Sequence, residues 1–188
     1  MRARMFALTL AIVAAGAQPA KGQEGLKPRS LHDGFWVGFG LGGGSNLSDA
    51  ARGARFGFGG DVMLGGTLSE RFLLGGEIVG WGRKVGGSTL TQSNAMAVAL
   101  LYPSGMGLFL KGGIGFAGWT QGATVGNTTT STTAGGFGLG AGVGYDLQVG
   151  SNLFLTPAVD FLYQAVESNV FQNSSASLLM FTLGLTWH

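Results

Sequence analysis

Apolar residues alternate with small or polar residues over most of the chain after residue 33. The first such stretch runs from Phe35 to Leu41, where large apolar residues at odd positions alternate with Trp36 and glycines at even positions. Alternation with a period of two is typical of a β-strand whose two faces meet different surroundings. No later stretch shows the 3.6-residue period of an amphipathic helix, so the pattern predicts an all-β protein.

The alternation predicts eight strands, at residues 35–43, 55–67, 72–82, 94–102, 107–119, 135–147, 153–164 and 176–187. Each has roughly 9–13 residues, which suits the 9–11 that a tilted strand needs to cross a bilayer. Strands of ordinary globular proteins average about 5–6 residues. The strand lengths therefore favour a membrane barrel.

The connections alternate between long and short. Long polar segments follow every odd-numbered strand, at residues 44–54, 83–93, 120–134 and 165–175, and short ones follow the even-numbered strands, at 68–71, 103–106 and 148–152. Outer-membrane barrels have short periplasmic turns and longer external loops. The pattern predicts an eight-stranded antiparallel up-and-down transmembrane β-barrel with both termini in the periplasm.

We expect the large apolar residues to face lipid, and glycine, alanine, threonine and a few charged residues to face the lumen. Every backbone amide needs a partner in lipid, so such a sheet must close on itself. If large apolar residues face lipid, the outward face of the fourth predicted strand carries Met96, Val98, Leu100 and Tyr102. Aromatic residues near strand ends are expected to form the interfacial girdles, namely Phe35, Phe56, Phe72, Tyr102, Tyr145, Tyr163 and Trp187.

The N-terminus has the pattern of a secretory signal. Arg2 and Arg4 precede a short apolar run, and small residues follow it. We predict a signal peptide at residues 1–22, cleaved after Ala17 or Gly22, a polar leader at 23–33 and the barrel at 34–188. Cleavage after Gly22 leaves eight of the eleven Lys and Arg residues against nine acids, a net charge of −1, which does not favour a nucleic-acid partner.

Composition narrows the chemistry further. Charged residues make up 11% of the chain, under half of the usual share of about 25%. Cysteine is absent, so disulfides and thiolate metal sites are excluded, and we expect no metal and no cofactor. The only histidines are His32 and His188, both placed at the periplasmic end without a serine partner, so we expect no catalytic activity.

Five charged residues share the face predicted to line the lumen, namely Asp61, Glu77, Lys111, Asp146 and Asp160. A charge on the lipid face would be costly, so this placement agrees with the assignment of faces. The residues could form a structural ion-pair network or line a solute path. The many inward glycines leave open whether the lumen contains a cavity.

Three segments carry a resemblance to a known family, namely Phe35-Trp36-Val37-Gly38, the stretch 108–116 and the closing stretch 181–187. The chain resembles the small eight-stranded outer-membrane barrels, the OmpX-like and OmpA N-terminal barrel group. The resemblance implies a bacterial outer-membrane location and a C-terminal signal that the barrel-assembly machinery recognises. Trp187, followed here by His188, would be its final aromatic, and the rest of the signal would be Leu179, Phe181, Leu183 and Leu185.

The leading hypothesis is a non-enzymatic, monomeric outer-membrane protein. It would be surrounded by outer-membrane lipid and would be structural or interact with an unknown external partner through its loops. One alternative is a narrow channel or a lumen-binding protein for small or apolar solutes. A second alternative is a soluble secreted carrier, which requires the apolar faces to point inward and the charged residues to face solvent.

Overall fold

The computed structural model describes residues 34–48, 56–105, 107–125, 128–167 and 174–188. The predicted signal peptide (1–22) and polar leader (23–33) lie outside this range. In the described part of the chain, no helix is long and apolar enough to cross a membrane.

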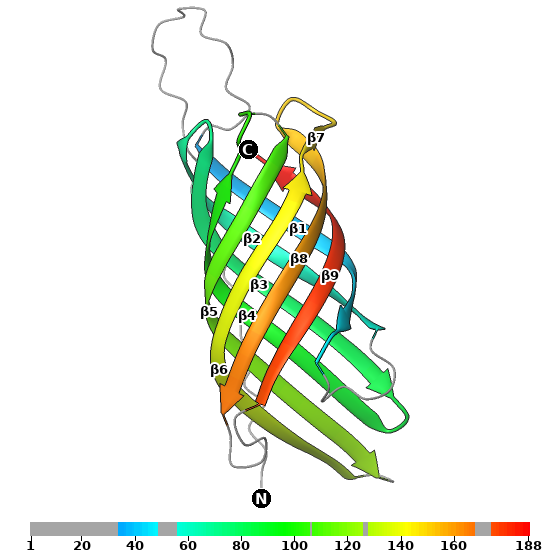
Figure 1. The fold of residues 1–188 in the computed structure, drawn as a ribbon. Coiled ribbons are helices and arrows are strands. Elements are labelled where there is room, and N and C mark those ends of the chain that lie inside the picture. Colours follow the sequence, from blue (N-terminus) through cyan, green and yellow to red (C-terminus); the bar gives the residue numbers. More distant parts are fainter. Residues whose placement is uncertain (1–33, 49–55, 106, 126–127, 168–173) are drawn as a thin grey trace, which may run out of the picture.

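The described residues form a single antiparallel sheet that closes into a barrel (Figure 1). Its strands are β1 (Phe35–Asn46), β2 (Phe56–Ser69), β3 (Phe72–Val85), β4 (Ser88–Leu101), β5 (Leu108–Val125), β6 (Thr128–Tyr145), β7 (Leu147–Gln148), β8 (Leu153–Glu167) and β9 (Ser174–Trp187). Each long strand pairs with its neighbours in sequence, β1 pairs with β9, and β6 pairs with β8. The predicted all-β, eight-stranded antiparallel barrel is confirmed.

The two-residue strand β7 is a continuation of β6. Gly144 faces Ala158 and Leu147 faces Leu155, so both segments keep the same register against β8. The ladder is interrupted where Pro157 stands on β8, and proline has no amide hydrogen to donate. The barrel wall therefore consists of eight strands, one of which, β6 together with β7, is interrupted at a single position.

The strands are strongly tilted. The register does not return to its starting residue after one turn round the barrel. The path starts at Trp36 and ends at Asn46, ten residues further along β1, and it passes through Gly65, Gly75, Val98, Gly113, Gly140, Leu162 and Leu178. Ten residues rise about 33 Å, and eight strands span about 38 Å of circumference, so the tilt is about 40°. Such a barrel is just wide enough for side chains to fill it.

The outer wall is apolar. Leu41, Phe58 and Phe116 each expose at least three quarters of their surface, and most odd-numbered residues of β1 and even-numbered residues of β2 and β5 follow the same rule. All five charged residues of the predicted lumen set are buried inside. This is the reverse of the arrangement that the secreted-carrier alternative requires, so that alternative is wrong.

The orientation predicted for the fourth strand is wrong. Met96, Val98 and Leu100 of β4 are buried in the lumen, and the alanines between them face outward. Tyr102, which follows β4, is also buried, so it does not belong to an interfacial girdle, whereas the other six aromatics of the predicted girdles are exposed. Alanine is apolar enough for lipid, and the large side chains fill space that inward glycines elsewhere leave.

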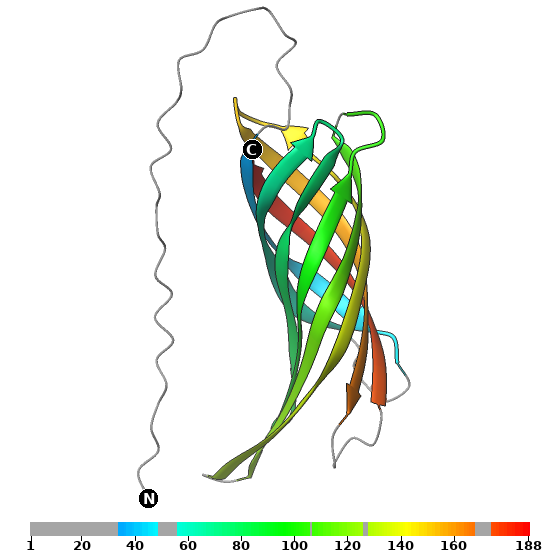
Figure 2. The same cartoon turned by 90° about the vertical axis from the view of Figure 1, so that its left-hand side faces the viewer.

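Two of the predicted long connections are mostly strand. β3 and β4 are joined by Gly86 and Gly87 alone, and β5 and β6 continue to Val125 and Thr128. Figures 1 and 2 show this hairpin extending past the ends of the other strands. Threonine has a high strand propensity, so these polar segments keep the ladder although they lack apolar alternation. We call this end of the barrel the projecting end, and the opposite one the short-turn end.

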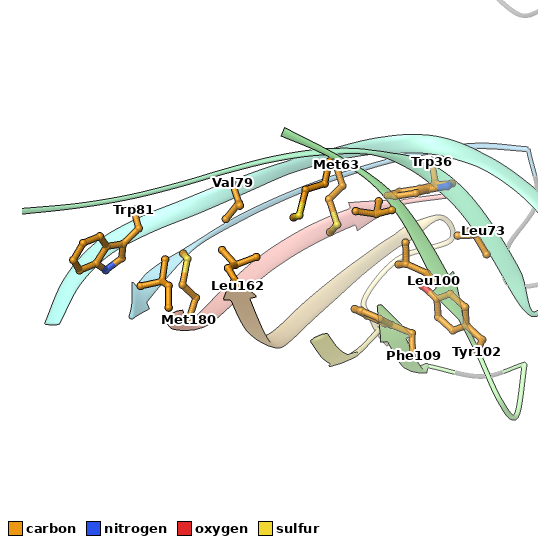
Figure 3. Close-up of a cluster of buried hydrophobic side chains, with 13 residues drawn as sticks. Trp36, Met63, Leu73, Val79, Trp81, Leu100, Tyr102, Phe109, Leu162 and Met180 are labelled. Carbon is orange, nitrogen blue, oxygen red and sulfur yellow. The ribbon is translucent and has the colours of Figure 1, made fainter. Parts of the chain in front are cut away.

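Large side chains pack tightly inside the barrel (Figure 3). Inward glycines make room for them. A Cβ added to Gly144 would overlap the Phe109 ring, and one added to Gly75 would lie 2.8 Å from the Trp36 ring. In both pairs a glycine makes room for a large residue, on the neighbouring strand for Gly144 and Phe109 and two strands away for Gly75 and Trp36.

Candidate functional site in the barrel lumen

A charged cluster occupies the middle of the lumen. Nζ of Lys111, on β5, lies 2.5 Å from Oε1 of Glu77 on β3 and 2.9 Å from Oδ1 of Asp160 on β8. All three side chains are at least 95% buried. Lysine has a long flexible stem, so one ammonium can bridge carboxylates that project from opposite sides of a narrow barrel.

A glycine lets two of these side chains meet. Lys111 and Asp160 both face Gly142 of β6, one on each side of it. A Cβ on Gly142 would collide with Oδ1 of Asp160. The glycine-rich alternation of β6 therefore creates the space in which the ion pair forms.

Asp61 of β2 lies beside this cluster. It faces Gly40 of β1 and is also buried. Together with Lys111 and Asp160 it lines a small cavity of about 10 Å³, whose wall also includes Thr182. That volume is about the size of one water molecule, so the lumen beside this charged cluster is nearly filled.

Asp146 lies apart from the other four charged residues, near the short-turn end. Its carboxylate accepts hydrogen bonds from the Tyr102 hydroxyl at 2.7 Å and from Oγ1 of Thr156 at 2.6 Å. Nε2 of His188 lies 3.7 Å from the same carboxylate, and the imidazole ring packs edge-on against Phe154. Burial and the neighbouring Asp146 charge raise the pKa of Tyr102 above its ordinary value, so the phenol stays a hydrogen-bond donor.

A third polar layer lies toward the projecting end and consists of amide side chains. Asn46 donates to Gln92 at 3.0 Å, and Gln164 donates to Asn94. The Trp119 indole in turn donates to Oε1 of Gln164 at 2.6 Å. Most of the polar atoms of these buried amides have partners, which is the condition under which polar groups are tolerated inside a barrel, and Nε2 of Gln92 is the exception among those described.

Sequence reasoning identified the charged residues of the lumen but grouped them as one set, and it missed the amide layer and Tyr102. A signal for the orientation of this strand was present. Gln92 and Asn94 share the parity of Met96, and two amides on one face of a strand are unfavourable neighbours for lipid. That parity assigns the whole even-numbered face of β4 to the lumen.

The predicted assembly signal lies on β9. Phe181, Leu183 and Trp187 face outward and are more than half exposed, and Leu179 and Leu185 share their face. His188 is buried and turns inward. The chain therefore presents an outward apolar ladder that ends with Trp187, and recognition of that ladder by the assembly machinery stays a prediction.

A closed antiparallel barrel with an apolar outer wall and a polar interior defines an integral outer-membrane protein of bacteria. The comparison of the sequence with protein families agrees with this class. The family described as outer membrane protein beta-barrel domain matches residues 6–188, and the chain belongs to this family. Its location is the bacterial outer membrane.

Solved structures share the fold at low sequence identity. Ail, the attachment invasion locus protein of Yersinia pestis, is 11% identical with a TM-score of 0.61, over 82% of this chain and 98% of that one. Neisserial surface protein A is 16% identical with a TM-score of 0.59, over 82% of this chain and 97% of that one. Another Ail structure holds the heparin analogue sucrose octasulfate. No curated protein sequence matches the chain.

Proposed function

We propose that this chain is a non-enzymatic, monomeric outer-membrane barrel that interacts with an external partner through its projecting end. In this orientation the short-turn end and both termini face the periplasm. The rule that outer-membrane barrels place short turns in the periplasm supports the orientation. The cleaved signal peptide predicted at residues 1–22 would direct the chain across the inner membrane.

The observation that most directly supports this proposal is an open sheet edge on β6. Residues 128–145 of β6 all pair with β5, but pairing with β8 begins at Gly135, opposite Glu167. The backbone of residues 128–134 therefore faces no partner strand among the described residues. Unpaired strand edges can accept an extended segment of another protein as an added strand.

The filled lumen favours this function over the channel alternative. Large apolar side chains lie between three polar layers, and the cavity beside Lys111 measures only about 10 Å³. Conduction would require ion pairs and buried amides in several layers to separate together. A lumen-binding role meets the same difficulty, because the cavity holds little more than one water molecule.

The interior also gives little support to catalysis. The two hydroxyl groups nearest the carboxylate of Asp146 both donate to it, those of Tyr102 and Thr156. A hydroxyl nucleophile needs a base that takes its proton and access to substrate, and both groups are buried. These buried groups are better explained as a cross-link that holds the short-turn end together.

Labelling in intact cells tests the orientation, because the chain has no cysteine of its own. Ser131→Cys, on the projecting hairpin, should react with a membrane-impermeant maleimide on intact cells. Gln148→Cys, at the short-turn end, should react only after the outer membrane is permeabilised. Labelling of Gln148→Cys alone in intact cells would show that the orientation is reversed.

A second experiment tests the role itself. Removal of residues 121–132 should leave a folded barrel, detected by its altered migration in unboiled gels, and should abolish adhesion of cells to immobilised matrix proteins and glycans. A planar-bilayer recording of the full chain should show no discrete conductance steps. Stable conductance steps would favour the channel alternative.

A further inference from the structure

The outer wall changes from apolar to hydroxyl-bearing within one step along three neighbouring strands. Ala95, Phe116 and Phe137 face one another across β4, β5 and β6 and form the last apolar row toward the projecting end. Beyond them, the outward positions described on these strands carry only hydroxyl groups and glycine. We call the six hydroxyl-bearing residues the hydroxyl platform, namely Thr89, Thr91, Ser93, Thr120, Ser131 and Thr133.

The register arranges the platform in rows. Thr91 faces Thr120, and Thr120 faces Thr133, so three threonines of adjacent strands stand side by side. The two hydroxyl oxygens of Thr120 and Thr133 lie 3.2 Å apart. Adjacent strands are about 4.8 Å apart and alternate residues about 6.7 Å apart along a strand, so the hydroxyls form a regular grid.

Glycines keep this grid open. Gly118 and Gly122 of β5 and Gly135 of β6 stand between the hydroxyl residues on the same face. A Cβ on Gly122 or Gly135 would have no neighbour closer than about 3.9 Å, so neither position is covered by another side chain. A flat surface of this kind can contact a broad, flexible ligand but offers no deep pocket.

The platform is electrically neutral. Lys84 of β3 flanks it beside Thr89, and Glu167 of β8 flanks it beside Gly135. A phosphate-rich ligand would need several cations, and a protein partner would need large anchor side chains to bury. Neither is present within the platform, whereas hydroxyl groups both donate and accept hydrogen bonds, as sugar hydroxyls do.

The platform continues the lipid-facing wall directly. With strands tilted by about 40°, each pair of residues rises about 5 Å along the membrane normal, so the three hydroxyl rows stand about 5, 10 and 15 Å beyond the Phe116–Phe137 row. Aromatic residues mark the membrane interface in such barrels. The rows are therefore level with the headgroups of lipids that touch the wall below.

We propose that the hydroxyl platform binds the neutral sugar headgroups of glycolipids that pack against the barrel. In the cell, this binding would anchor the projecting sheet in the carbohydrate layer of the outer leaflet. That setting rests on the orientation in the proposed function. Binding of glycolipid to the platform can be tested without knowing the orientation, because vesicles carry their lipids in both leaflets.

The test compares the heat stability of the barrel in phosphatidylcholine vesicles with and without digalactosyl diacylglycerol, a neutral glycolipid. A ligand that binds only the folded state raises its stability. We expect the glycolipid to raise the midpoint of heat-induced unfolding of the natural chain by about 2–4 °C, the shift that roughly one kcal/mol produces in a protein of this size. The readout is the loss of the compact gel band.

The decisive variant is Thr91→Val/Thr120→Val/Thr133→Val, which removes hydroxyls but keeps β-branched side chains of nearly equal shape. It should lose the glycolipid shift. The matched control Thr130→Val/Thr132→Val, on the opposite face of β6, should keep it. If the triple variant does not fold, Thr120→Val alone should reduce the shift.

Three outcomes would overturn the proposal. The natural chain could show no shift with the glycolipid, or the platform variant could keep the full shift. Anionic phosphatidylglycerol could also produce an equal shift, which would mean that the wall responds to lipid composition in general rather than to sugar. Failure of the proposed function would appear elsewhere, as reversed cysteine labelling or as adhesion that does not depend on the hairpin.

Discussion

Replacing Lys111 by methionine should strongly destabilise the barrel. The ammonium group of Lys111 is the only described positive charge that is ion-paired with Glu77 and Asp160, at 2.5 and 2.9 Å. Methionine fills a similar volume but leaves both carboxylates buried without their partner. The substitution therefore tests the electrostatic role of Lys111 with little change in packing.

The magnitude follows from burial. At an effective dielectric constant of about 20, each contact provides about 6 kcal/mol of gross attraction, most of which offsets the cost of removing the charges from water. Removing one partner from a buried pair typically costs about 3–5 kcal/mol, because the remaining charge is uncompensated. We expect a loss in this range, or a decrease of roughly 10 °C in the unfolding midpoint.

Urea unfolding in detergent micelles, followed by tryptophan fluorescence, measures this loss. The control is the triple variant Lys111→Met/Glu77→Met/Asp160→Asn, which removes all three charges and should recover most of the stability. A loss below about 1 kcal/mol for Lys111→Met would refute the reasoning. So would a triple variant as unstable as the single one, because the defect would then be one of packing.

Three further predictions test other features. Gly142→Val should cost about 1–3 kcal/mol in urea unfolding by overpacking, whereas Gly112→Val, whose added Cβ meets no atom within 4 Å, should be nearly neutral; equal losses would contradict the paired packing. Tyr102→Phe should cost about 1–2 kcal/mol by removing the hydrogen bond to Asp146. Because the folded pKa of Tyr102 is raised, the advantage of the natural chain should persist up to about pH 10 and be lost as the pH rises further. Trp187→Ala should lower the fraction of assembled barrel in cells without affecting refolding from urea in micelles, and a loss in both would indicate a packing role.

The alternation of apolar with small or polar residues was enough to predict the fold, because contact with lipid requires one face of each strand to be apolar. The pattern failed where both faces are apolar. On β4, the outward alanines and the inward Met96 and Val98 satisfy an apolar rule equally well. Only the polar residues Gln92 and Asn94 show which face points inward, because they share the even-numbered face with Met96. These two residues lie at the edge of the stretch in which apolar alternation predicts a strand.

The lumen site was only partly predictable for a related reason. The parity of Asp61, Glu77, Lys111 and Asp160 follows from the sequence, because each alternates with apolar residues. The contacts among their side chains depend on the barrel register, which is displaced by ten residues after one turn. No local sequence pattern specifies that displacement. The length of the β5–β6 hairpin was missed because threonine and serine continue a strand without apolar contrast.

The pairing of glycines with large residues has a consequence for how the strands find their alignment. A slip of two residues along any one pair of strands would keep every side chain on its own face and most backbone hydrogen bonds intact. Any such slip would change the circumference of the barrel, and a slip between β5 and β6 would also place Phe109 against a residue other than Gly144. Backbone bonding and lipid thus tolerate several alignments, and the interlocking of the interior selects one among them.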